Sequence, residues 1–156
     1  MISVGIGEYV ITDSKNESLN THALGSCVAL IIHCTKTKCT AMAHIVLPNQ
    51  DVNHKRILAK EAYFASDIVP KLIDFFVNRP YCRPEHLQIM LVGGAVSSHA
   101  TDVFKVGERN VHKIKTILEG YNLDYDATEV LGRFSRSVEI DVKSGEVIIK
   151  KKEMHI

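Results

Sequence analysis

This sequence lacks an excess of charge, a long apolar run and any internal repeat. Its 19 basic and 18 acidic residues leave a formal net charge of +1. Such a balance gives no electrostatic case for nucleic acid or an anionic membrane surface as a partner. The short basic cluster at residues 150–152 does not change this, and we interpret it as a solvated strand end.

Signals for membrane insertion or export are also missing. No apolar stretch reaches the roughly 18 residues that a membrane-spanning helix requires. The first residues, Met-Ile-Ser-Val-Gly, lack the basic region and apolar core of a secretory signal. We therefore expect no direct membrane insertion and a cytoplasmic location.

The four cysteines, which would suffice for two disulfides, are better explained as thiols. A chain of 156 residues can bury a core large enough to do without disulfides, and the absent signal favours a reducing compartment. We expect at least two of them to be ordinary buried residues. The four are Cys27, Cys34, Cys39 and Cys82.

The composition is that of one globular domain covering residues 1–156, with 46% apolar and 24% charged residues. Apolar runs predict about seven strands, clustered at both ends of the chain, and this clustering disfavours a doubly wound parallel sheet. Helical periodicity covers residues 59–78, where Pro70 should kink or divide the helix, and residues 108–121. We predict a mixed α and β fold with two main helices.

One stretch, residues 21–48, carries the clearest chemistry. Two apolar runs joined by a short polar loop predict neighbouring antiparallel strands, with Cys27 before the first and His44 on the second. A thiol within hydrogen-bond reach of an imidazole is the arrangement that produces a thiolate nucleophile. The stretch therefore indicates a cysteine hydrolase or amidase.

The turn before the cysteine contains candidates for the other groups that such a site needs. A turn containing Gly25 and Ser26 can direct backbone N–H groups inward, where they stabilise a thiolate or an oxyanion. Thr21 and Ser26 are the local candidates for the third polar group that orients the imidazole. The pattern alone leaves the alternative that Cys27 and His44 are packed core residues.

A zinc site is the competing chemistry. His33, Cys34, Cys39 and His44 are all of the residue types that bind zinc. Side chains alternate between the two faces of a strand, so His33 and Cys34 should point apart, and so should Cys39 and His44. We therefore expect no metal site and no cofactor. A phosphate-binding loop after Gly93-Gly94 is also disfavoured, because the Gly-Lys-Ser/Thr ending is absent.

Leu-Gly-Ser-Cys at 24–27, Ala-His at 43–44 and several further short motifs occur along the chain. Their order and spacing resemble the CheD family, the chemoreceptor glutamine deamidases of bacterial chemotaxis. The resemblance runs over nearly the whole chain, and its most specific part is Leu-Gly-Ser-Cys at 24–27 followed by Ala-His at 43–44. The other motifs are Gly5 to Tyr9, Thr21, Ala41-Met42, Leu47-Pro48, Gly93 to Ala95, Gly107 with Arg109-Asn110, Gly132-Arg133, and Arg136 to Val138.

The resemblance implies a protein-glutamine glutaminase with Cys27 as nucleophile, His44 as general base and acid, and Thr21 as the third triad member. It implies a layered α/β fold similar to deamidase toxins of the cytotoxic necrotizing factor type, and needs no cofactor. Methyl-accepting chemotaxis receptors are the implied substrates, methyl-ester hydrolysis is an implied side activity, and the phosphatase CheC is the implied regulator.

Two features leave room for other interpretations. Where the family pattern has an apolar residue and a glycine after the threonine, this chain has His22 and Ala23. We expect His22 on the surface, and Ala23 to restrict the turn. Arg133 and Arg136 fit either a surface that docks an acidic receptor or a solvated strand edge.

The alternative function is a binding adaptor for CheC or receptors with little or no catalysis.

Overall fold

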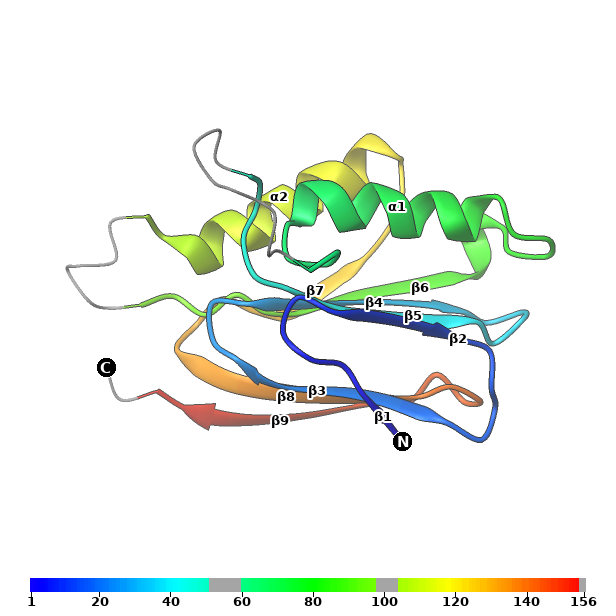
Figure 1. Ribbon diagram of the computed structural model, residues 1–156, viewed down its shortest axis with the longest axis horizontal. Helices are drawn as coiled ribbons and strands as arrows, with labels where there is room; N and C mark the ends of the chain where they lie inside the picture. The colour runs from blue at the N-terminus through cyan, green and yellow to red at the C-terminus, as the bar shows by residue number, and fades with distance from the viewer. Residues whose placement is uncertain (51–59, 98–103, 155–156) are drawn as a thin grey trace.

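The computed structural model describes residues 1–50, 60–97 and 104–154, and these form three layers (Figure 1). Two helices cover one face of a five-stranded sheet, and a four-stranded sheet covers the other face. The elements in chain order are β1 (Ile2–Ser3), β2 (Tyr9–Thr12), β3 (Ser18–Leu24), β4 (Val28–Cys34), β5 (Thr40–Ile45), α1 (Ala65–Val77), the 3₁₀ turn η2 (Pro84–His86), β6 (Leu87–Gly93), α2 (Val106–Gly120), β7 (Asp126–Val130), β8 (Phe134–Asp141) and β9 (Val147–Glu153).

The five-stranded sheet has the order β2-β5-β4-β6-β7 and is antiparallel except for the β6–β7 pair. All seven residues of β4 are buried, because helices cover one face of this strand and the second sheet covers the other. Such double burial explains why β4 is a nearly continuous apolar run in the sequence. The predicted antiparallel pairing of β4 with β5 is confirmed.

The four-stranded sheet has the order β1-β3-β8-β9. Only one face of it is covered, so β8 alternates between buried and partly exposed positions. The predicted hairpin through Gly145 is confirmed as the β8–β9 pair. The pairing of β3 with β8, which joins the two ends of the chain, was not predicted.

Each face of the five-stranded sheet has its own apolar core. On the helix side, Leu30 and Ile32 pack with residues of α1 and α2. On the other side, Ala29 and Ile31 pack with Leu19 of β3 and with residues of β8. The space between the sheets is therefore reached by alternate residues of β4 and β5, and the site lies at one end of this space.

The mixed α and β architecture predicted from the sequence is confirmed, with nine strands and two α-helices among the described residues. Of the two predicted effects of Pro70, a kink or a division of the helix, the division is wrong, since α1 runs continuously through it. Pro70 lies close to the middle of α1, between buried residues that hold the helix against the sheet, namely Ile68, Val69, Leu72 and Ile73. The expected helix start at residue 59 lies outside the described residues.

Neither helix in the described part has the length and apolar character needed to cross a membrane.

Candidate active site

The site is built around a hydrogen bond between Thr21 and His44, two residues from different sheets. His44 lies on β5 of the five-stranded sheet, and Thr21 lies on β3 of the other. Their side chains meet between the sheets, with 2.7 Å between Thr21 Oγ1 and His44 Nδ1. Both residues are only 1% exposed, so water does not compete for this bond. The structure thus brings together two of the three residues implied by the resemblance.

The hydrogen bonds of Thr21 fix which nitrogen of His44 carries the proton. The Thr21 hydroxyl donates its single hydrogen to the carbonyl oxygen of Val4 at 2.7 Å. Thr21 Oγ1 can then only accept from the ring, so His44 Nδ1 must be the donor. His44 Nε2 therefore has a free lone pair, and it is buried without a hydrogen-bond partner among the described residues. An unpartnered buried lone pair of this kind is suited to accept a proton.

Cys27 lies directly before β4 on the same face as His44. Ala29 is the cross-strand partner of His44, and Cys27, two residues earlier, packs against the core between the sheets. Diagonal neighbours on one face have Cβ atoms about 7–8 Å apart or closer, which long side chains can bridge. Cys27 is partly exposed, whereas the other three cysteines are buried. It is thus the cysteine that both a substrate and His44 can approach.

Burial shifts the pKa of both groups toward their neutral forms. The pKa of the Cys27 thiol is raised, because burial disfavours the thiolate. The pKa of His44 is lowered for the same reason, because burial disfavours the imidazolium. Both shifts favour a thiol beside a neutral imidazole, whose free Nε2 lone pair can accept a proton.

The turn before Cys27 is held by close backbone approach. Gly94 N–H donates to the Cys27 carbonyl at 2.9 Å, and Ala95 N–H donates to the Gly25 carbonyl at 2.8 Å. A Cβ atom on Gly93 would lie 2.3 Å from the Cys27 carbonyl oxygen, so only glycine fits there. The glycine pair Gly93-Gly94 thus both turns the chain and supports the backbone of Cys27. The N–H of Gly25 is already engaged by the Ala23 carbonyl at 3.1 Å, which leaves Ser26 and Cys27 as the turn's amide donors.

Asn110 of α2 is a site residue whose role the sequence did not reveal. It is fully buried, and its Nδ2 donates to the carbonyls of Ser26 and Val46, each at 2.9 Å. It therefore contacts both the segment before β4, which carries Cys27, and the segment after β5, which carries His44. One signal in the sequence was available, because Asn110 shares the helix face of the buried Gly107, Val111 and Ile114.

Arg136 corrects one interpretation from the sequence. The solvated strand edge and the acidic docking surface are both wrong for this residue, because it is only 4% exposed. Its Nη1 donates to the Gly93 carbonyl at 3.3 Å, and its Nε lies 3.4 Å from Glu129 Oε2. The side chain supports the glycine pair from within the molecule. Arg133 is exposed, as either interpretation requires.

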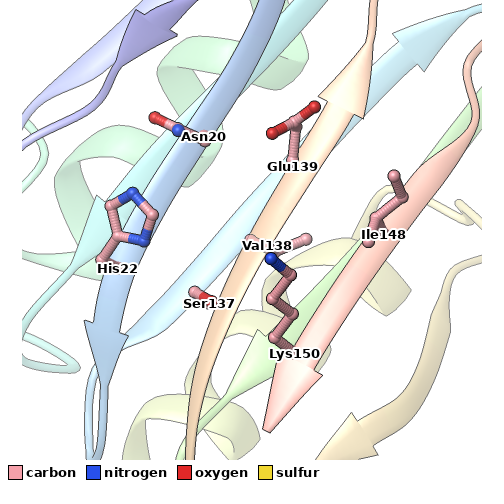
Figure 2. A pocket seen from close by; sticks show the side chains of 7 residues that line it. All are labelled: Asn20, His22, Ser137, Val138, Glu139, Ile148 and Lys150. Atoms are coloured by element: carbon pink, nitrogen blue, oxygen red, sulfur yellow. The ribbon is translucent and has the colours of Figure 1, made fainter.

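His22 faces away from Thr21, on the outer face of the four-stranded sheet. It is exposed, and with Asn20 it lines a shallow hollow there (Figure 2). The remaining residues that line this hollow come from β8 and β9 and are Ser137, Val138, Glu139, Ile148 and Lys150. This agrees with the alternation of side chains along a strand. Ala23, at the position of the expected glycine, adopts a left-handed conformation with φ of 58°.

The four candidate zinc ligands do not converge. Cys34 and Cys39 belong to the core on the helix side, whereas His44 lies between the sheets. His33 bonds Thr40 Oγ1 through Nδ1 at 2.7 Å and is engaged there. Within residues 1–50, 60–97 and 104–154, no group of three or more histidine, cysteine or acidic side chains is arranged to hold a metal ion.

Comparison with known proteins links the chain to one family. Residues 46–151 match the family model described as CheD chemotactic sensory transduction. This matched stretch begins just after His44 and includes Asn110 and Arg136.

Curated relatives extend the similarity over nearly the whole chain. A probable chemoreceptor glutamine deamidase CheD of Syntrophotalea carbinolica is 32% identical, with 92% of this chain and 90% of the relative covered. A protein of the same name from Desulforamulus reducens is 34% identical, with 96% and 89% covered. The chemoreceptor glutamine deamidase CheD of Thermotoga maritima is 29% identical, with 95% and 90% covered.

Proposed function

Since the chain belongs to the CheD family, we propose that it deamidates glutamine side chains of methyl-accepting chemotaxis receptors. The names of its curated relatives support this activity. The observation that carries the proposal is the buried lone pair on His44 Nε2, which is fixed by the Thr21 hydrogen bond beside the partly exposed Cys27. We assign Cys27 as nucleophile, His44 as base and acid, and Thr21 as the residue that orients the imidazole.

Acylation begins with the thiol of Cys27 in its neutral form. His44 Nε2 takes the thiol proton as Sγ bonds to the carboxamide carbon, and the carbonyl electrons move onto oxygen. The amides of Ser26 and Cys27, in the turn after Gly25, stabilise this oxyanion. The C–N bond then breaks, ammonia leaves with the proton from His44, and a thioester remains.

Deacylation repeats these roles with water as the attacking group. His44 takes a proton from water, the hydroxide bonds to the thioester carbon, and the C–S bond breaks. The proton returns to Cys27, and the glutamine has become a glutamate. The proposed chemistry needs no metal or organic cofactor. The same acyl-enzyme would accept a methyl ester, with methanol as the leaving group, so receptor methyl-ester hydrolysis is a proposed side activity.

The setting of the reaction is part of the proposal. Receptor glutamines that become methyl-accepting glutamates are the substrates, and CheC is the regulating partner. The protein acts in the cytoplasm as one domain covering residues 1–156. Partial exposure of Cys27 supports a side chain presented on the surface of another protein as the substrate.

The test is ammonia release from a purified receptor cytoplasmic fragment, with mass spectrometry to detect conversion of glutamine to glutamate. Cys27→Ala and His44→Ala should abolish release while receptor binding persists. Cys82→Ala, which removes a buried thiol outside the site, is the matched control and should retain release. Receptor binding by wild type without any ammonia release would overturn the enzyme proposal in favour of an adaptor.

A further inference from the structure

The ladder between β4 and β5 breaks at the end that carries Cys27 and His44. In an antiparallel ladder, the hydrogen-bonded pairs recur at every second residue. His44 directs its backbone toward β2, where its N–H donates to Glu8 and its carbonyl accepts from Gly7. The pair that bonds across to β4 is therefore Val28 with Ile45. In this register the next bonded pair would be Ser26 with Leu47.

That next pair does not form. The N–H groups of Val46 and Leu47 instead donate to the carbonyl of Tyr63, each at 3.0 Å. The carbonyl of Ser26 is left without its ladder donor, and Asn110 Nδ2 supplies one at 2.9 Å. The second hydrogen of the same Nδ2 goes to the carbonyl of Val46 at 2.9 Å. Asn110 thus replaces the ladder where the two strands separate.

The orientation of the Asn110 amide follows from its surroundings. With Nδ2 against the two carbonyls, both of its hydrogens are used. The reverse orientation would place Oδ1 against two other oxygens, which is repulsive. Oδ1 itself is buried without a hydrogen-bond partner among the described residues. Burial of this amide with one end unsatisfied is costly, so the two hydrogen bonds at the other end have to offset it.

The bond to Ser26 has a direct consequence for Cys27. The carbonyl of Ser26 and the N–H of Cys27 belong to one peptide group, which is planar and trans, so they point in opposite directions. A donor that holds the carbonyl also fixes the direction of the N–H. No backbone carbonyl within the described residues accepts from the Cys27 N–H.

We infer that Asn110 is a positioning residue that orients the Ser26–Cys27 peptide so that the Cys27 N–H stabilises the oxyanion. The inference rests on the proposed function for its substrate, a carboxamide. It assigns to α2 a part in the reaction through the peptide group before Cys27. Removing the Nδ2 donors should weaken oxyanion binding and leave the thiol itself reactive.

The experiment separates thiol reactivity from oxyanion stabilisation. Iodoacetamide alkylates Cys27 by displacement at a saturated carbon, where no oxyanion forms. Propanal adds reversibly to the same thiol: the S–C bond forms, the carbonyl electrons move to oxygen, and the thiol proton transfers to His44. The dissociation constant of propanal is measured from its protection of Cys27 against iodoacetamide. Deamidation kcat and KM are measured on the receptor fragment.

Asn110→Leu should raise the dissociation constant of propanal at least tenfold and lower kcat by about 10²-fold, with KM little changed. Its alkylation rate without propanal should stay within about threefold of wild type, because displacement needs no oxyanion donor. Asn110→Ser, which keeps one donor, should be intermediate and also serves if Asn110→Leu does not fold. Ile114→Ala is the matched control: it shortens another fully buried side chain of α2 and should lower the melting temperature without changing propanal binding.

Equal dissociation constants for propanal in wild type and Asn110→Leu would overturn the inference, as would an equal rise in Ile114→Ala. A wild-type protein that binds propanal as expected but releases no ammonia would overturn the proposed function and leave the role of Asn110 standing. The two failures are therefore distinguishable.

Discussion

Two buried histidines of the five-stranded sheet make the same hydrogen bond, yet only one has the surroundings of a catalytic group. His33 Nδ1 bonds Thr40 Oγ1 at 2.7 Å, as His44 Nδ1 bonds Thr21 Oγ1 at 2.7 Å. In each pair the threonine hydroxyl donates to a backbone carbonyl, so each ring has Nδ1 as its donor. The histidines are 2% and 1% exposed. Hydrogen bonding and burial therefore do not distinguish them.

The difference lies at the other ring nitrogen. A Cβ on Gly145 would lie 2.7 Å from His33 Nε2, so the β8–β9 turn closes over that ring. The thiols near it in sequence, Cys34 and Cys39, pack on the helix side of the sheet. His44 Nε2 instead lies near the end of the sheet that carries the partly exposed Cys27. A histidine–threonine pair becomes a candidate site only where a thiol and an opening accompany it.

The largest expected effect comes from replacing each histidine. His44→Gln should lower deamidation kcat by roughly 10²- to 10⁴-fold, since it removes the base. His33→Gln should leave kcat within about threefold of wild type, because His33 serves the fold. Ammonia release from a receptor fragment measures both. Comparable losses in the two variants would show that the two pairs do not differ in function.

The next effect concerns the threonines. Thr21→Val should lower kcat at least tenfold, because the ring of His44 loses the acceptor that fixes its tautomer. Thr40→Val should leave kcat unchanged. Both should lose about 1–3 kcal/mol of unfolding free energy, because each leaves a buried ring N–H unpaired. Urea denaturation alongside the kinetics separates the two effects, and equal stability losses with unequal kcat losses are the expected result.

A smaller effect should appear as a pH dependence of stability. Burial lowers the pKa of both histidines, so the folded state favours the neutral rings. The pKa of histidine in the unfolded chain is about 6.5. The contribution of the neutral rings to folding stability is therefore fully present above that pH, and it is lost as the pH falls through their lower pKa values in the folded state. At His33 the charge of Lys38 adds to the lowering of the pKa and Asp141 partly opposes it, whereas burial alone lowers the pKa of His44. His33→Gln and His44→Gln should therefore each remove part of the acid sensitivity, measured as urea midpoints across this range, and unchanged midpoints in both variants would contradict this account.

The smallest effect concerns two strained residues, one near each pair. Ala23 follows Thr21 closely and has φ of 58°, and Lys38, before Thr40, has φ of 69°. A left-handed conformation costs a non-glycine residue about 1–2 kcal/mol. Replacement by glycine removes this strain but costs about 0.5–1 kcal/mol, because glycine loses more conformational freedom on folding. Ala23→Gly and Lys38→Gly should each stabilise the fold by roughly 0.5–1 kcal/mol. Thermal unfolding tests this, and a lower melting temperature for Ala23→Gly would show that its turn has no such strain.

Local patterns predicted the elements that are locally determined. The apolar runs of β4 and β5 and the turn at Gly145 were enough to predict two antiparallel pairs. The helical periodicity of residues 108–121 also predicted the second helix, in which Val111, Ile114 and Leu118 recur at helical spacing and are all buried. These features depend on residues close together in the sequence.

The rest depends on contacts between distant segments. Residues 18–20 are largely polar and carry no local strand signal, yet they begin β3, whose partner β8 lies near the other end of the chain. The separation into two sheets could not be predicted, because the four-stranded sheet takes its strands from both ends of the chain. Nothing local indicates that the amide of Asn110 reaches two strand ends. The local pattern leaves Thr21 and Ser26 as alternative partners of His44, and only the resemblance favours Thr21.

Pairing of β3 with β8 sets the order in which a newly made chain can gain its activity. Cys27 directly precedes β4 and His44 lies on the neighbouring β5, so they can come together while the later residues are still in the ribosome. Thr21 sits opposite Val138 and cannot be held until β8 has emerged and paired. On the proposed roles, an incomplete chain carries a thiol and a histidine without a fixed tautomer. On these roles the chain gains its full site only once β8 has paired with β3, late in its synthesis.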